Sequence, residues 1–183
     1  SSFDGSFNLE VQYWTSRGWF VAEVNYGGSS GFGRQYRERL NNLWGVLDSA
    51  DCIALAQSLK EEQLIDPSRI IISGNSAGGL TALTALYKTN LFKAAFCKYP
   101  VIDLNAMRSH THRFEKNYLN SLIGPFENNH RKYFERSPKN NSHKIKKPIL
   151  IFHGKKDSVI NFKESLDFNK KLLEKNVYSE IVL

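Results

Sequence analysis

The residues of this chain with the clearest chemical potential form a Gly-x-Ser-x-Gly pattern, made by Gly74, Ser76 and Gly78. This pattern is typical of a nucleophilic serine set on a sharp turn, where bulky neighbours would clash, so we expect both glycines to be required. The turn lifts the hydroxyl above a sheet, and the next helix points its first N–H groups at the place where an oxyanion would form. The pattern therefore predicts that Ser76 is a nucleophile.

The elements on either side of the pattern support this interpretation. Residues 70–72 are three consecutive isoleucines, which favour a short buried strand, and residues 80–86 are rich in Ala and Leu and favour a helix. Strand, turn and helix are the context in which the motif has chemical meaning. The alternative is an ordinary turn in which the serine only caps a helix.

A candidate acid follows a later apolar strand. Residues 149–152 predict this strand, Gly154 permits a bend, and Asp157 lies in the loop beyond. A carboxylate there would share the sheet edge with Ser76 and could orient a histidine and stabilise its imidazolium. The alternative is an aspartate that caps the next helix.

The base is missing from the expected position, because in this kind of fold the triad runs in the order Ser, acid, His. No histidine follows Asp157. His153 is expected to be a hydrogen-bonded residue at the end of a strand, and His110 and His112 could line a cleft without reaching Ser76. We therefore expect the catalytic histidine to lie beyond Leu183.

Strand-like and helix-like patterns alternate around the serine motif, which is typical of an α/β fold with a mostly parallel sheet and helices on both faces. Residues 103–142 break this alternation, and we interpret them as a cap-like insertion over the carboxyl edge of the sheet, where substrates bind in such folds. Helices are predicted over residues 8–16, 43–64 and 162–173, with short ones around 114–122 and 130–136, and strands over 19–24, 92–99, 148–152 and from 180.

Composition is that of an ordinary globular domain, with 41% hydrophobic and 23% charged residues among 183 and no apolar run of membrane-spanning length. The formal charge is +7, but the densest basic stretch, 139–147, has no interleaved aromatics, so we interpret it as a solvated loop and expect no nucleic-acid partner. Tyr36 stands where a dinucleotide fingerprint beginning at Gly31 would have glycine, and no cofactor or metal is expected. Cys52 and Cys97 are predicted to be buried free thiols, which favours a reducing, cytoplasmic location.

Three segments in this order carry a resemblance to a known family: residues 25–33 (Asn-Tyr-Gly-Gly-Ser-Ser-Gly-Phe-Gly), residues 74–79 (Gly-Asn-Ser-Ala-Gly-Gly) and the His-Gly-x-x-Asp of residues 153–157. Together they resemble the catalytic domain of the prolyl oligopeptidase family, closest to its acylaminoacyl-peptidase and dipeptidyl-peptidase-like members. The resemblance implies an α/β-hydrolase fold, usually behind an N-terminal β-propeller, and peptide cleavage by a Ser-Asp-His triad. It assigns the nucleophile to Ser76 and the acid to Asp157.

The chain departs from the family pattern in three places. The triad histidine, which the family carries in a Gly-His segment after the last strand, would lie beyond Leu183. The His-Gly-Gly-Pro oxyanion segment would precede Ser1, and Phe32 stands where many members have a tyrosine that helps to bind the oxyanion. The remaining donor is the backbone N–H of Ala77. We therefore expect one domain over residues 1–183, incomplete at both ends, without a propeller and nearly inactive alone.

The expected activity is hydrolysis of peptide bonds in oligopeptides or acylaminoacyl peptides. A carboxylesterase or dienelactone-type hydrolase on the same fold is one alternative, and a non-catalytic binding module is another. Four side chains could form an apolar substrate pocket: Tyr99, Met107, Phe114 and Tyr118. Glu115 could contact a substrate amino group.

Overall fold

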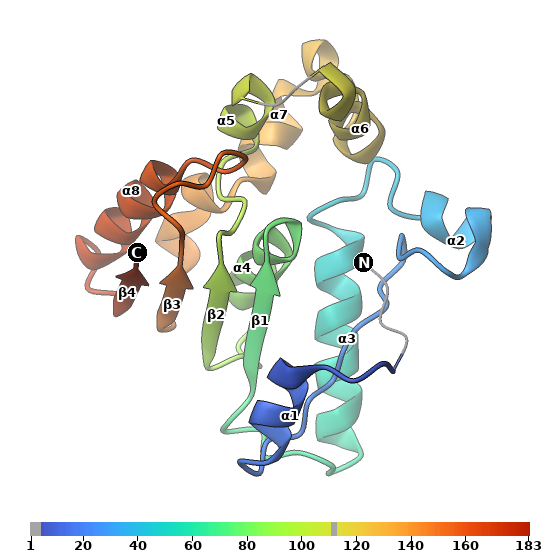
Figure 1. Ribbon diagram of the computed structural model, residues 1–183, viewed down its shortest axis with the longest axis vertical. Coiled ribbons are helices and arrows are strands. Elements are labelled where there is room, and N and C mark those ends of the chain that lie inside the picture. Colours follow the sequence, from blue (N-terminus) through green and yellow to red (C-terminus); the bar gives the residue numbers. More distant parts are fainter. Residues whose placement is uncertain (1–4, 111–112) are drawn as a thin grey trace.

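The computed structural model describes residues 5–110 and 113–183, and their side chains except those of 109–117. Its centre is a four-stranded parallel sheet in the order β1-β2-β3-β4 (Figure 1). All four carboxyl ends therefore point to one edge. The strands are β1 (Ile71–Asn75), β2 (Ala94–Lys98), β3 (Ile149–Phe152) and β4 (Ser179–Val182).

The two faces of the sheet differ because successive side chains of a strand point to opposite sides. Ala95 and Cys97 of β2 and Ile149 and Ile151 of β3 are buried in one hydrophobic core. Apolar residues of the other parity, such as Phe152, are more exposed. The first face therefore carries most of the packing.

Three helices cover the buried face: α3 (Leu47–Glu61), α4 (Ala77–Lys88) and α8 (Phe162–Leu173). The short helix α1 (Leu9–Thr15) lies against the other face, where Glu10 pairs with Lys98 of β2 at 2.7 Å. Helices thus lie on both faces, as the sequence predicts. No helix within the described ranges is both long and apolar enough to cross a membrane.

Helices α5 (Leu104–His110), α6 (Arg113–Ile123) and α7 (Phe126–Arg136) lie above the carboxyl ends of the strands, and α2 (Gly33–Glu38) projects to one side (Figure 1). A second hydrophobic cluster, which includes Leu80 of α4, joins this upper layer to the sheet layer. Helices of the region interpreted as an insertion, residues 103–142, thus lie above this edge, and its role as a cap over a substrate site stays a prediction. The 3-10 helix η1 (Pro138–Lys144) follows α7 and packs against α4 and α8.

Three predictions of local structure are wrong. Residues 19–24 form no strand; Trp19 instead donates its N–H to Trp14 O and packs edge-on against the Trp14 ring. The helix predicted from residue 43 begins only at 47, because Asn42 and Gly45 have positive φ angles that a right-handed helix cannot accommodate. The basic stretch 139–147 is largely η1, and Lys139 forms ion pairs with two carboxylates.

Candidate active site

Ser76 occupies a strained turn between β1 and α4. Its φ and ψ angles are 52° and −118°, a combination that non-glycine residues adopt only when the surroundings enforce it. Its N–H donates to Lys98 O at 3.0 Å, and its own carbonyl accepts the N–H groups of Gly79 and Val101, both at 3.0 Å. The backbone of β2 and of the segment after it thus holds the turn.

Two glycines let the turn close, but they are not the predicted pair. A Cβ on Gly74 would lie 2.1 Å from Gly78 O, and a Cβ on Gly79 would lie 2.4 Å from the Pro100 Cβ. A Cβ on Gly78 would meet nothing within 4 Å. The prediction that Gly78 must lack a side chain is therefore wrong. Gly74 lies close to the backbone of Gly78, but a side chain on Gly78 itself would point into open space. The second glycine of the Gly78-Gly79 pair is the sterically required one.

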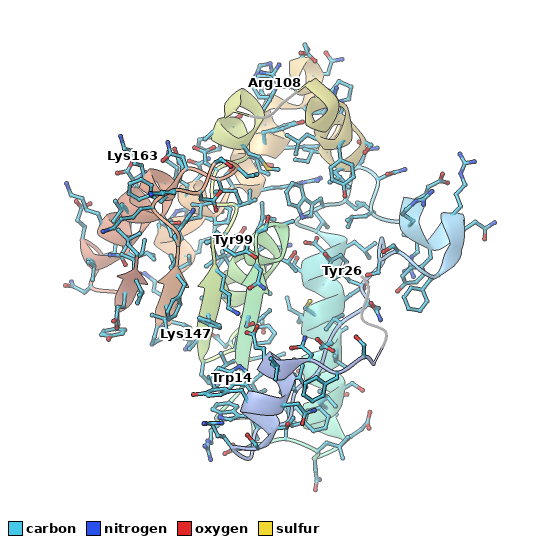
Figure 2. The ribbon with its side chains drawn as sticks, viewed as in Figure 1. Trp14, Tyr26, Tyr99, Arg108, Lys147 and Lys163 are labelled. Atoms are coloured by element: carbon cyan, nitrogen blue, oxygen red, sulfur yellow. The ribbon has the colours of Figure 1, made fainter. Side chains whose placement is uncertain are left out.

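Ala77 is the first residue of α4, and its side chain is exposed. The first N–H groups of an α-helix have no partner within the helix, so they are free to receive a negatively charged oxygen. Tyr99 follows β2 directly, with an unusual φ of 38° and a half-exposed side chain near the carboxyl ends of β1 and β2 (Figure 2). Strained backbone thus gathers at this end of the sheet.

Asp157 follows β3 and lies at the same carboxyl edge of the sheet as Ser76. Its Oδ1 accepts the N–H groups of Val159 and Ile160, both at 2.9 Å. Its Oδ2 is 3.6 Å from His153 Nε2, which is too long for a hydrogen bond. The helix that follows, α8, is capped by Asn161, whose side chain accepts the Lys163 N–H. Asp157 therefore does not cap that helix, and one of its oxygens remains available to a further N–H donor.

His153 is a structural residue, as predicted. It is buried, with Nε2 2.9 Å from Ile160 O and Nδ1 2.8 Å from Ser165 Oγ. Because a carbonyl only accepts, Nε2 must donate its proton to Ile160 O. Both ring nitrogens are occupied, so His153 is not placed to act as a base.

Of the other histidines, His130 packs against Phe126 with ring centroids 4.0 Å apart, and His143 belongs to η1. His112 lies outside the described residues, and the side chain of His110 is not described. Within the described ranges no three His, Cys, Asp or Glu residues gather closely enough to hold a metal ion.

The predicted specificity residues are spread over the upper layer. Met107 lines a small cavity whose wall includes Val159 and Ile160, the two residues bonded to Asp157. Tyr118 is 60% exposed on α6, whereas Phe32, which stands at the position of the family's oxyanion-binding tyrosine, is 53% exposed before α2. The side chains of Phe114 and Glu115 lie outside those described. The cavity beside Met107 thus connects a specificity candidate to the Asp157 loop.

The family model for the prolyl oligopeptidase family matches residues 5–183. The chain belongs to this family. Its parallel sheet, flanking helices and serine turn are those of the α/β-hydrolase fold that the catalytic domains of the family share.

Similarity to individual proteins agrees with the family. The chain is 29% identical to dipeptidyl aminopeptidase BIII of Pseudoxanthomonas mexicana over 98% of its own length and 26% of that protein. It is 26% identical to the acylamino-acid-releasing enzyme of Arabidopsis thaliana over 97% of its length and 24% of that protein. The chain thus spans about a quarter of the length of these curated relatives.

Solved structures give a tighter match. A puromycin-hydrolyzing peptidase of Mycobacterium tuberculosis superposes with a TM-score of 0.92 and 43% identity, over 96% of this chain and 27% of that one. A second puromycin hydrolase superposes with a TM-score of 0.91 and 40% identity, over 95% and 26%. These two neighbours are named as a peptidase and a hydrolase that act on puromycin, and each is about four times as long as this chain.

Proposed function

We propose that residues 1–183 form most of one catalytic domain of a serine peptidase, with Ser76 as nucleophile, Ala77 N–H as oxyanion donor and Asp157 as triad acid. The observation that carries the proposal is the backbone of Ser76, held at φ 52° and ψ −118° where a parallel strand meets a helix. Asp157 follows a strand of the same sheet, its Oδ1 is bonded to the loop backbone, and its side chain is 19% exposed, which supports a further bond from an imidazole N–H to Oδ2. This combination is the one that acyl transfer needs.

The reaction follows from these positions. Ser76 Oγ attacks the peptide carbonyl carbon while its proton passes to a histidine, and the negative oxygen of the tetrahedral intermediate is stabilised by the Ala77 N–H. The C–N bond then breaks, and the histidine gives its proton to the leaving amine. Water hydrolyses the ester on Ser76 by the same sequence in reverse. Asp157 stabilises the imidazolium at each stage.

The histidine of this triad is proposed to come from sequence outside these 183 residues. His153 is occupied by Ile160 O and Ser165, and the order of the triad places the base after Asp157. The whole protein is proposed to act on peptides, with a further N-terminal domain, a β-propeller, supplied by the same polypeptide. The free thiols of Cys52 and Cys97 support a reducing compartment such as the cytoplasm.

The test uses the full-length protein with an aminoacyl p-nitroanilide as substrate and a fluorophosphonate as covalent probe. We expect Ser76→Ala to abolish labelling and to lower kcat by about 10⁴-fold or more, and Asp157→Asn to lower kcat by about 10³- to 10⁴-fold. Matched controls are Ser73→Ala on the exposed face of β1 and Asp167→Asn on the exposed side of α8. Both should behave as wild type.

Retained turnover and unchanged labelling in Ser76→Ala would refute the proposed nucleophile. Hydrolysis of nitrophenyl esters with no cleavage of any peptide substrate would instead indicate an esterase. The isolated 183-residue chain should show only residual turnover, since the residual catalysis left after a triad member is lost comes from the oxyanion donor and binding alone.

A further inference from the structure

A buried carboxylate lies behind the serine turn and is not part of the proposed triad. Asp48 stands in the first turn of α3 with no exposed surface, and it accepts a hydrogen bond from Thr81 Oγ1 of α4. Thr81 is also buried, and its Oγ1 lies 3.4 Å from Ala77 O. A continuous set of contacts therefore runs from the start of α3 to the first residue of α4.

Charges of the surrounding elements converge on the same place. Lys88 of α4 donates to Gly45 O and Ser49 Oγ, both at 3.0 Å, at the beginning of α3. Arg136 of α7 donates to Asn42 O and Trp44 O, both at 3.0 Å. The start of α3 is thus bound from two other helices.

Burial and the neighbouring charges shift the pKa values of Asp48, Lys88 and Arg136. Burial raises the pKa of Asp48, against the opposing effect of the Thr81 hydroxyl and the nearby backbone N–H groups. Burial lowers the pKa of Lys88 and of Arg136, and in both cases the charge of Asp48 opposes the shift. The negative charge of Asp48 thus favours the charged forms of Lys88 and Arg136, whereas the charge of Arg136 disfavours that of Lys88.

We propose that Asp48 and Thr81 are positioning residues for acyl transfer, which fix the first turn of α4 and with it the oxyanion donor Ala77 against the strained backbone of Ser76. This inference rests on the proposed function. The strained backbone of Ser76 persists only where surrounding contacts enforce it. An oxyanion donor must also be placed closely, because a misplacement of about 1 Å can cost about 10²-fold in rate.

The decisive variants distinguish the effect of the Thr81 hydroxyl from the effect of the packing of its side chain. Thr81→Val keeps the shape of the side chain and removes the donor to Asp48, whereas Thr81→Ser keeps the donor. Thr84→Val is the matched control, since Thr84 is a buried threonine of the same helix that does not bond to Asp48. The measurements are kcat and KM of the full-length protein with an aminoacyl p-nitroanilide, the Ki of a peptide boronate, and the melting temperature.

We expect Thr81→Val to lower kcat by about 10- to 100-fold with KM within twofold. The boronate Ki should rise by the same factor as kcat/KM falls, because the tetrahedral boronate adduct places an oxygen at the oxyanion position. Thr81→Ser should restore most of kcat, and Thr84→Val should match wild type. If Thr81→Val does not fold, Asp48→Asn should show the same division between kcat and KM.

A Thr81→Val protein that melts lower but keeps the kcat and boronate Ki of Thr84→Val would overturn the inference and leave the proposed function intact. A wild-type protein that the boronate does not inhibit, and whose turnover survives Ser76→Ala, would overturn both. The two failures are therefore distinguishable.

Discussion

The turn that carries Ser76 and the loop that carries Asp157 lie at the same edge of one sheet, but different kinds of contact hold them. The turn depends on residues distant in sequence: Lys98 O, Val101 N–H and the side chain of Pro100. Behind it, Thr81 is bonded to Asp48, 33 residues away.

The side-chain hydrogen bonds of the Asp157 loop join residues that are close in sequence, although Ile160 also packs against the second hydrophobic cluster. Asp157 bonds to the N–H groups of Val159 and Ile160, and His153 bonds to Ile160 O and to Ser165 of the next helix. The nucleophile is therefore positioned by the tertiary structure of the whole domain, and the acid by a local unit of about one loop. Changes near Ser76 should act on the entire fold, whereas changes near Asp157 should remain local.

The largest effect is expected at Gly74. In Gly74→Ala the new Cβ would overlap the backbone of Gly78, at 2.1 Å from its oxygen and 2.4 Å from its carbonyl carbon. We expect a loss of about 4 kcal/mol or more in unfolding free energy, or failure to fold. The matched control is Gly78→Ala, which meets open space and should gain up to about 1 kcal/mol from helix propensity. Calorimetric melting of the full-length protein measures both, and equal melting temperatures for the two variants would contradict the steric account.

The second effect is expected at His153. His153→Ala removes a buried ring and leaves Ile160 O and Ser165 Oγ without their partner, at a cost of about 2–4 kcal/mol. Ser165→Ala removes only one of the two bonds and should cost about 0.5–1.5 kcal/mol. Amide hydrogen exchange should accelerate in residues 153–165 and not in residues 74–88. Equal acceleration in both segments would show that the acid loop is not an independent unit.

The same division explains what could be predicted from the sequence. The helix over residues 162–173 and the strand, turn and helix around Ser76 were recognisable because each rests on local spacing and turn chemistry. The steric role of Gly79, the open position at Gly78 and the contact between Asp48 and Thr81 were not, because they depend on which segments meet in space. The apolar pattern of residues 19–24 misled for a similar reason, since a strand also requires a neighbour to pair with.

A smaller effect is expected in β2, the strand between the two regions. Cys97 pairs in register with Gly74 of β1 and Ile151 of β3, and burial raises the pKa of its thiol to about 12. Because the folded pKa is the higher one, the stabilisation is complete below the unfolded pKa of about 8.5 and is lost as pH rises toward 12, by about 1.4 kcal/mol per pH unit.

Melting temperatures of wild type and Cys97→Ala at pH 8 and pH 10 measure the stability that is lost as the Cys97 thiol titrates. Cys97→Ala should start lower because of the cavity it leaves, but it should lose less stability between the two pH values, since the titration of other groups is common to both proteins. Parallel losses would show that the thiol is not titrated by unfolding in this range.

The smallest effect is expected for the ion pair between Glu10 and Lys98. Its atoms are 2.7 Å apart, but the two side chains are 41% and 31% exposed, so the pair should contribute less than about 1 kcal/mol. Ser76 is bonded to the backbone carbonyl of Lys98 rather than to its side chain. Glu10→Gln should therefore change the melting temperature slightly and leave kcat within twofold of wild type. A tenfold loss of kcat would mean that α1 controls the serine turn through the Lys98 side chain, and that the backbone of β2 is not a sufficient support for the nucleophile.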